Sequence, residues 1–159
     1  MTACAVPLSL RLADATRASH RAAERAGFMP SLLRGEIAPT TYVLFLRNLH
    51  ALYDALERAL ETQAGKQVLA PIQARTLFRA DVLAADLDHL APRWSALPVA
   101  AAMRAYVVRI ETLARAHPAL LAAHAYVRYM GDLSGGQLLR DIVRRALGLR
   151  DDRGTNFYA

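Results

Sequence analysis

Apolar side chains recur every three or four residues along most of the chain, the spacing that lines one face of an α-helix. The clearest run covers residues 39–60, where Pro39 and two threonines supply the start signal. Its apolar positions are Tyr42, Phe45, Leu46, Leu49, Tyr53, Leu56 and Leu60. The same pattern predicts helices over residues 99–113 and 118–146, the second ending before Gly148.

Weaker periodicity predicts two further helices, over residues 8–27 and 71–89, and a polar, loop-like segment over 150–154. No alternating, β-branched run bounded by turn residues is present in the sequence, so we expect no strands. The length of 159 residues fits one domain. We therefore predict an all-α, single-domain multi-helix bundle spanning residues 1–159.

Composition excludes several protein classes. The chain is 54% hydrophobic and 21% charged, with only 8 Gly and 7 Pro, which is globular rather than disordered or collagen-like. A single cysteine, Cys4, cannot form an internal disulfide and gives little support to nucleophilic catalysis. No apolar stretch approaches the roughly 18 residues of a membrane span, and we expect no signal peptide. These features favour a cytoplasmic protein.

The formal net charge is +6, and it rests almost wholly on arginines scattered along the chain, because Lys66 is the only lysine. A nucleic-acid-binding protein would be expected to gather its arginines on one helix or arm, so we predict no nucleic-acid partner. A basic surface also suits an anionic cofactor or an acidic protein partner. Charge alone does not choose between these.

The first predicted helix carries His20 on a stripe with Thr16, Ala23 and Gly27, none of which is large. A face that only fills a core would usually carry Leu or Ile there, whereas small residues leave room for a flat ligand. Imidazole is the commonest metal ligand, and one axial histidine can hold a heme iron. An ordinary histidine in a crowded helix interface remains the alternative, and spacing alone leaves both open.

A second candidate is the glycine-rich run 131–137, Gly-Asp-Leu-Ser-Gly-Gly-Gln, which lies where the flanking periodicity predicts a helix. Each glycine inside a helix costs about 1 kcal/mol relative to alanine, so three cost roughly 3 kcal/mol. Either the helix ends here in a turn, or it bends so that its backbone can approach a ligand with no Cβ in the way.

Two pairs have the one-turn spacing of a carboxylate-bridged metal site: Asp86 with His89, and His20 with Glu24. A di-iron bundle would need further glutamates facing the interior, and Glu24 is the only one that we expect there. The sequence therefore favours a heme site over a di-iron site.

The candidate residues lie in longer motifs. Residues 122–137 resemble the distal-helix signature of the heme oxygenases. From Ala123 onward they read Ala-His-Ala-Tyr-Val-Arg-Tyr-Met-Gly-Asp-Leu-Ser-Gly-Gly-Gln. Residues 16–24, followed by Phe28 and Met29, resemble the proximal-helix motif of that family. The segment 92–94 and the helix that carries Tyr53 fall into register as well. The resemblance runs from about residue 8 to the end of the chain.

The resemblance implies that heme lies between two helices, with His20 as the proximal iron ligand. Asp132 would anchor an ordered water network that supplies protons during the reaction, with Tyr53 and Arg128 helping to hold it. Gly131 and Gly135 complete the implied catalytic set, because they let the distal helix lie close over the porphyrin. The implied heme contacts are His20, Thr16, Arg17, Ala23, Glu24, Met29, Tyr126, Gly131, Gly135 and Gly136.

The reaction implied by the resemblance is the oxidative opening of heme to biliverdin, carbon monoxide and ferrous iron. It uses dioxygen and an external electron donor, a ferredoxin or a flavin reductase, since the sequence has no flavin or nicotinamide fingerprint. We expect a monomer. The alternatives are a heme-binding or heme-sensing module that does not turn over, and a bundle of the same fold with another small ligand.

Two departures from the family pattern are visible. Family members normally continue for several dozen residues past the position of Ala159, so we expect the C-terminal helices of the family fold to be missing from this sequence. The basic residue that often reaches a heme propionate aligns with Ala13, and Arg17, one turn further on, is the candidate substitute.

Overall fold

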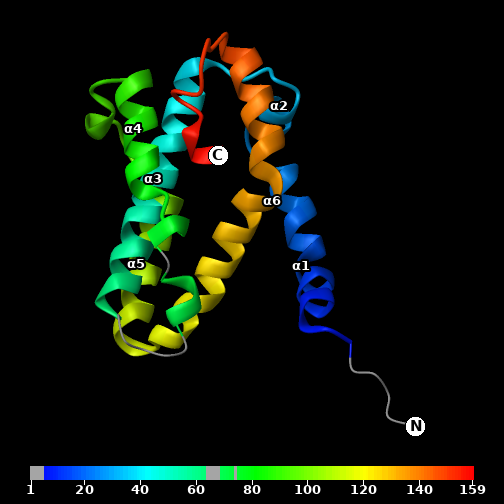
Figure 1. Cartoon of the computed structure of the whole chain (residues 1–159), viewed down its shortest axis with the longest axis vertical. Coiled ribbons are helices and arrows are strands. Elements are labelled where there is room, and N and C mark those ends of the chain that lie inside the picture. Colours follow the sequence, from blue (N-terminus) through cyan, green and yellow to red (C-terminus); the bar gives the residue numbers. More distant parts are fainter. Residues whose placement is uncertain (1–5, 64–68, 74) are drawn as a thin grey trace.

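The computed structural model describes residues 6–63, 69–73 and 75–159, and Cys4 and Lys66 lie outside these ranges. The described residues form helices and no strands (Figure 1), which confirms the all-α prediction. The α-helices are α1 (Leu8–Glu24), α2 (Met29–Leu33), α3 (Pro39–Thr62), α4 (Ala80–Leu90), α5 (Ala101–Ala116) and α6 (Leu121–Leu147). Short 3₁₀ segments are η1 (Ala70–Ile72), η2 (Arg75–Leu77), η3 (Trp94–Ala96), η4 (Pro118–Leu120) and η5 (Asn156–Tyr158). Within the described ranges, no helix is long and apolar enough to cross a membrane.

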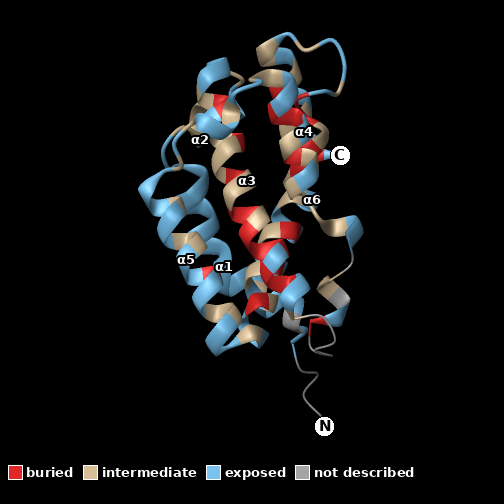
Figure 2. Ribbon diagram, turned by 90° about the vertical axis from the view of Figure 1, so that its left-hand side faces the viewer, coloured by how far each residue is buried: buried red, intermediate tan, exposed pale blue. Residues whose placement is uncertain are grey.

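Helix α3 is the centre of the core and packs against α4, α5 and α6. Its apolar stripe is buried along almost the whole helix, as the run of buried positions in Figure 2 shows. The buried members predicted from periodicity include Tyr42, Leu46, Leu49, Tyr53, Leu56 and Leu60. Burial of this stripe, rather than helix propensity, provides most of the stability of such a helix.

Two predicted helices begin or end elsewhere than expected. The segment 71–89 is not one helix: η1 and η2 come first, and α4 starts only at Ala80. The carboxylate of Glu57 accepts the backbone N–H groups of Arg79 at 2.6 Å and Ala80 at 3.1 Å, which satisfies donors at the start of α4. Helix α1 ends at Glu24 rather than near Gly27, which has a φ of 55° and so turns the chain.

The glycine-rich run lies inside α6, which continues from residue 121 to 147, so the interpretation of this run as a turn is wrong. Figure 1 shows that α6 changes direction part-way along its length. The helix stops at Gly148, whose φ is 64°. The Leu149 N–H donates to the Arg144 carbonyl at 3.0 Å and the Gly148 N–H to the Arg145 carbonyl at 3.3 Å. This pair of bonds is the Schellman arrangement that closes many helices.

The chain after α6 first forms the predicted loop, over residues 150–154, and then re-enters the core. Phe157 and Tyr158 in η5 are only 2% and 5% exposed, and η5 contacts both α4 and α6. The polar composition of the loop gave no indication of this return, because the two aromatic residues follow it rather than belong to it.

Candidate functional site

Asp132, Tyr53 and Arg128 form one polar cluster between α3 and α6. The Tyr53 hydroxyl donates a hydrogen bond to Asp132 Oδ2, and Arg128 Nη2 lies 3.7 Å from Asp132 Oδ1. The Arg128 guanidinium also stands over the Tyr53 ring, 5.5 Å from its centroid. The two α6 residues meet because they are four positions apart, one helical turn. The structure thus brings together the three polar residues that the sequence analysis grouped.

Burial dominates the electrostatics of this cluster. The Asp132 side chain is 15% exposed, and its removal from water raises the pKa of its carboxyl from 3.8 to about 7. Removal from water also lowers the pKa of Arg128. A carboxyl that titrates near neutral pH can both release and accept a proton under ordinary conditions. Asp132 therefore has the acid–base properties of a group that relays protons.

A second layer of polar contacts lies behind Tyr53. The Tyr129 ring stacks on the Tyr53 ring with centroids 5.8 Å apart, and the Tyr129 hydroxyl donates to Glu57 Oε1 at 3.4 Å. Burial raises the pKa of Glu57. The expectation that Glu24 is the only interior glutamate is wrong, since Glu57 is 5% exposed while the Glu24 side chain is 50% exposed. A signal was present: Glu57 lies one turn after Tyr53 on the same face.

One more contact, beside this layer, joins α5 to α6. The Tyr106 hydroxyl and His124 Nδ1 are 2.8 Å apart. Burial raises the pKa of Tyr106 and lowers that of His124. The contact fixes the N-terminal half of α6 against α5, and so helps to place the polar cluster.

The outer face of α6 is open and apolar around the glycines. Val127, Met130 and Leu138 are exposed on this helix, although each is a large hydrophobic residue. A Cβ added at Gly131 or Gly135 would meet no atom within 4 Å outside the helix backbone, among the residues that the structure describes. Apolar side chains beside bare backbone form a surface that a flat apolar ligand can approach closely.

The third glycine does not share this open face. A Cβ on Gly136 would lie 3.3 Å from the Tyr158 carbonyl oxygen, so Gly136 lets η5 pack against α6. The predicted contact residue Tyr126 is exposed. The structure therefore separates the predicted glycine set into two open positions and one that is closed by the C-terminal segment.

His20 lies on an exposed stretch of α1. Its side chain is 73% exposed and its Nδ1 is 3.3 Å from Glu24 Oε1, which leaves Nε2 as the nitrogen free to bind a metal. A histidine ligand commonly has a carboxylate on its other ring nitrogen. The alternative of a histidine packed in a crowded helix interface is wrong for the described structure. No hydrogen bond or ion pair between described residues links His20 to the Asp132 cluster.

The other predicted residues of α1 are also exposed. The Thr16 hydroxyl bonds back to the Leu12 carbonyl at 2.8 Å, and Arg17 Nη2 lies 3.1 Å from Asp14 Oδ1. Ala23 is exposed, whereas Met29, at the start of α2, packs partly buried against the core. The small-residue stripe of α1 is therefore not used for core packing in the described structure.

These features fit a heme better than a cluster of protein-bound metal ions. The described residues contain no group of three or more His, Cys, Asp or Glu side chains placed to hold a metal ion. Asp86 and Glu57 are both occupied by backbone N–H groups. The chain offers instead one imidazole with an orienting carboxylate, and an apolar helical face without Cβ atoms.

The comparison with known proteins decides the family. The sequence model of the family described as heme oxygenase matches residues 6–159. The chain belongs to the heme oxygenase family. It is 39% identical over 153 residues to the heme oxygenase of Porphyra purpurea. That match covers 95% of this chain but 65% of the relative, so the chain spans just under two thirds of its length.

Solved heme oxygenase structures resemble this fold closely. Heme oxygenase-1 from the cyanobacterium Synechocystis sp. PCC6803, solved in complex with heme, has a TM-score of 0.90 and 36% identity. The match covers 97% of this chain and 70% of that one. Heme oxygenase from Leptospira interrogans has a TM-score of 0.91, also at 36% identity. That match covers 97% of this chain and 76% of the Leptospira chain.

Proposed function

We propose that this chain cleaves heme oxidatively to biliverdin, carbon monoxide and ferrous iron. The observation that carries this proposal is the buried Asp132 carboxyl, hydrogen-bonded to Tyr53 and placed beside the open Gly131–Gly135 face of α6. A relative with this fold has been solved in complex with heme. The buried carboxyl and the open glycine positions that the proposal uses lie on the same stretch of α6.

Heme would be held through His20 Nε2 on its proximal side. Glu24 orients the ring by accepting from Nδ1, which also makes the other nitrogen a better ligand. Thr16 and Ala23 are exposed on the same helix and leave room for the porphyrin. On the distal side, the apolar residues around Gly131 and Gly135 would lie against the ring.

The edges of the ligand would meet other predicted residues. Met29 would lie beside the proximal helix, and Tyr126 near the propionates, with Gly136 buried behind the distal face. Arg17 can reach a propionate only by leaving Asp14, which costs little because exposed ion pairs of this kind are weak.

When bound, heme supplies both the iron at which dioxygen is reduced and the ring that is oxidised. The task of the protein is orientation and proton supply. Asp132 holds a proton at its carboxyl near neutral pH, the Tyr53 hydroxyl fixes one carboxyl oxygen, and Arg128 stands beside the other. The bare backbone at Gly131 and Gly135 lets the helix approach the ligand.

The proposal includes the partners and the setting. Dioxygen is the co-substrate, and electrons come from a ferredoxin or a flavin reductase. The net charge of +6 on this chain suits the docking of an acidic electron carrier. We infer a single heme oxygenase-like domain that acts as a monomer. A single cysteine in the sequence favours a reducing, cytoplasmic location.

The test is a one-to-one titration of the purified chain with hemin, read at the Soret band, followed by ascorbate under air with an iron chelator. A saturable Soret band that is lost in His20→Ala, followed by biliverdin absorbance that is lost in Asp132→Asn, supports the proposal. Heme binding without biliverdin would instead favour the heme-sensing alternative. Absence of saturable binding would contradict both.

A further inference from the structure

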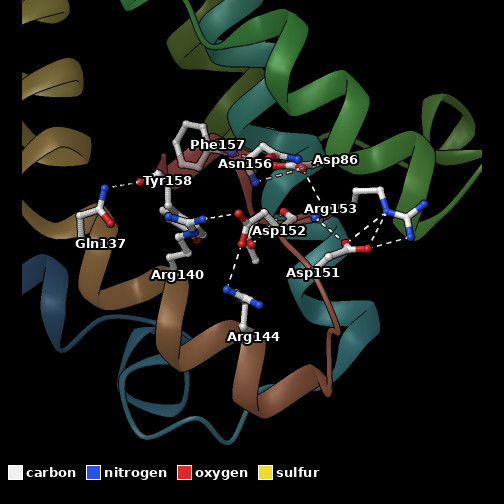
Figure 3. A network of polar contacts seen from close by, with 12 residues as sticks. Asp86, Gln137, Arg140, Arg144, Asp151, Asp152, Arg153, Asn156, Phe157 and Tyr158 are labelled. Atoms are coloured by element: carbon white, nitrogen blue, oxygen red, sulfur yellow. Dashed lines mark hydrogen bonds and ion pairs between the residues drawn. The ribbon is translucent and has the colours of Figure 1, made fainter.

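Asp86, on α4, is completely buried, and the proposed heme chemistry does not use it. Its spacing from His89 suggested a metal pair, but His89 is exposed, and the described residues contain no group of three or more His, Cys, Asp or Glu side chains placed to hold a metal ion. The Asp86 carboxylate instead accepts four N–H groups from the C-terminal segment, as Figure 3 shows. A buried carboxylate needs such partners, because an unpaired one would be very costly.

The four hydrogen bonds come from three residues of the segment 154–157. Asp86 Oδ1 accepts from the Gly154 N–H at 2.8 Å, the Asn156 N–H at 3.1 Å and the Asn156 side-chain amide at 3.0 Å. Asp86 Oδ2 accepts from the Phe157 N–H at 2.8 Å. Charge-assisted bonds to backbone amides are among the stronger hydrogen bonds in proteins. One side chain therefore fixes the backbone of residues 154–157.

Other contacts place this segment but do not replace Asp86. The Tyr42 hydroxyl donates to the Gly154 carbonyl at 2.9 Å. Asp152 pairs with Arg140 at 2.5 Å and with Arg144 at 2.9 Å, which ties the preceding loop to α6 (Figure 3). These bonds hold residues before 155, whereas the backbone N–H groups of Asn156 and Phe157 depend on Asp86.

The fixed segment leads directly to the polar cluster. The Phe157 ring packs against the Tyr53 ring with centroids 5.8 Å apart. The next residue, Tyr158, places its carbonyl oxygen at 3.3 Å from the Cβ position of Gly136, one turn of α6 after Asp132. Gln137 Nε2 donates to the same carbonyl at 3.4 Å. The segment therefore contacts Tyr53 through Phe157 and contacts α6 through Tyr158.

We propose that Asp86 is a positioning residue for the Tyr53–Asp132 pair: it holds Phe157 against the Tyr53 ring, and so keeps the Tyr53 hydroxyl on the Asp132 carboxyl and water away from it. The catalytic meaning of this role rests on the proposed function, but the geometric role does not. The charged and titratable groups around Asp132 are Tyr53 from α3, Arg128 from its own helix and Tyr158 from η5. Asp86 influences two of these through Phe157, whose ring packs on Tyr53 and whose chain neighbour is Tyr158.

The test measures the pKa of Asp132 in the heme-free protein, from the pH dependence of its ¹³C carboxyl resonance, assigned by comparison with Asp132→Asn. Hydrogen exchange of the Phe157 amide reports separately on the loop. Three variants weaken the proposed chain of contacts at different points. Asp86→Asn replaces one acceptor oxygen and the negative charge by an NH2 donor. Asn156→Ala removes a single bond to Asp86, and Phe157→Leu removes the ring that packs on Tyr53.

The matched control is Asp81→Asn. Asp81 lies on the same helix but is exposed, and it makes no contact with the C-terminal segment among the hydrogen bonds and ion pairs of the described residues. It separates a general loosening of α4 from loss of the specific bonds. Circular dichroism establishes that each variant keeps its helical fold.

In Asp86→Asn and Phe157→Leu we expect the pKa of Asp132 to fall by about one unit or more. Burial is what raises this pKa, so the entry of water outweighs the loss of the Tyr53 hydrogen bond, which alone would raise it further. Asn156→Ala should lower it less, and Asp81→Asn should leave it unchanged. A folded Asp86→Asn with fast Phe157 exchange and an unchanged Asp132 pKa would overturn the proposal. If Asp86→Asn does not fold, the other two decide: lowered pKa values in both support the proposal, and unchanged values refute it.

The experiment also separates this inference from the proposed function. The titration needs no heme, so a shifted Asp132 pKa supports the positioning role even if the chain yields no biliverdin. Conversely, biliverdin formation that depends on Asp132 but not on Asp86, in a folded variant, would support the function and remove the catalytic meaning of the positioning role.

Discussion

The Tyr53 hydroxyl donates a hydrogen bond to the Asp132 carboxyl, and this bond joins residues that are 79 positions apart in the chain. It connects the most buried helix of the fold to the glycine-rich stretch of α6. The donor has a rigid position in the core, whereas the acceptor lies beside an open helical face. Under the proposed function, Tyr53 holds the Asp132 carboxyl from the interior, and the carboxyl passes its proton toward the open face where heme is proposed to lie.

The first prediction concerns Asp132→Asn. The amide keeps the size of the side chain but cannot exchange a proton near neutral pH, so we expect heme binding to remain and biliverdin formation to slow by about 10² to 10⁴-fold. Soret titration measures the first and single-turnover absorbance with ascorbate the second. An equal loss of binding and turnover would show that Asp132 serves the structure of the site rather than proton transfer.

The second prediction concerns stability against pH. Burial raises the pKa of Asp132 to about 7 in the folded chain, above its value of 3.8 when exposed. The folded state therefore binds the proton more tightly than the unfolded state, and the stabilisation from that proton is complete below pH 4 and lost as pH rises through 7. We expect the free energy of unfolding of the wild type, relative to Asp132→Asn, to fall by up to about 4 kcal/mol over this range.

Urea unfolding of both heme-free proteins at a series of pH values measures this difference. The other titrating groups are common to the two proteins and cancel in the comparison. A difference that does not change between pH 4 and pH 8 would mean that the Asp132 pKa is not raised.

The third prediction concerns Tyr53→Phe. The phenol is fully buried and donates to the carboxyl, so its removal withdraws a hydrogen bond that favours the charged form of Asp132. We expect the pKa of Asp132 to rise above about 7. The alkaline limb of the activity–pH profile, where the proton-donating carboxyl loses its proton, should then move to higher pH. The ring packing is kept, and the loss of stability should be only about 1 kcal/mol. A profile that does not move would place Tyr53 outside the proton path.

Sequence periodicity predicted the helices whose packing is decided by their own apolar stripes, α3, α5 and α6. It failed where a distant residue decides the local structure. The start of α4 depends on the Glu57 carboxylate in α3, and the return of Phe157 to the core depends on Asp86. Neither contact leaves a periodic trace, because each partner lies more than 20 positions away.

The candidate site also contains residues that the sequence predicted and residues that only the folded structure shows. The motif around Asp132 placed Arg128 one turn away on the same helix, and the family resemblance added Tyr53 from another. It did not distinguish Gly136 from Gly131 and Gly135, since only the folded position of Tyr158 shows which glycine is covered. Glu57 and Tyr129 were missed because their importance comes from what they contact across α3, α4 and α6.

The fourth prediction compares the glycines of α6. Gly135→Ala places a methyl group in open space and improves helix propensity, so the heme-free protein should gain up to about 1 kcal/mol of stability. Under the proposed function, the same methyl group keeps the porphyrin from the backbone, so hemin affinity and biliverdin yield should fall. Gly136→Ala places its methyl group 3.3 Å from the fixed Tyr158 carbonyl and should destabilise the protein instead. Thermal unfolding and hemin titration of both variants test these opposite effects.

The fifth prediction separates the two roles on α1. His20→Ala should abolish the saturable Soret band without changing the stability of the heme-free protein, because the imidazole is exposed and packs against no core residue. Glu24→Gln keeps a hydrogen-bond acceptor but removes the charge beside Nδ1, so hemin should bind about 10 to 100-fold more weakly while the Soret band is retained. The control is Glu111→Gln, an exposed glutamate on α5 away from α1, which should bind hemin as the wild type does. If Glu24→Gln matches that control, Glu24 does not orient the ligand, and His20 would have to be positioned by the heme contacts alone.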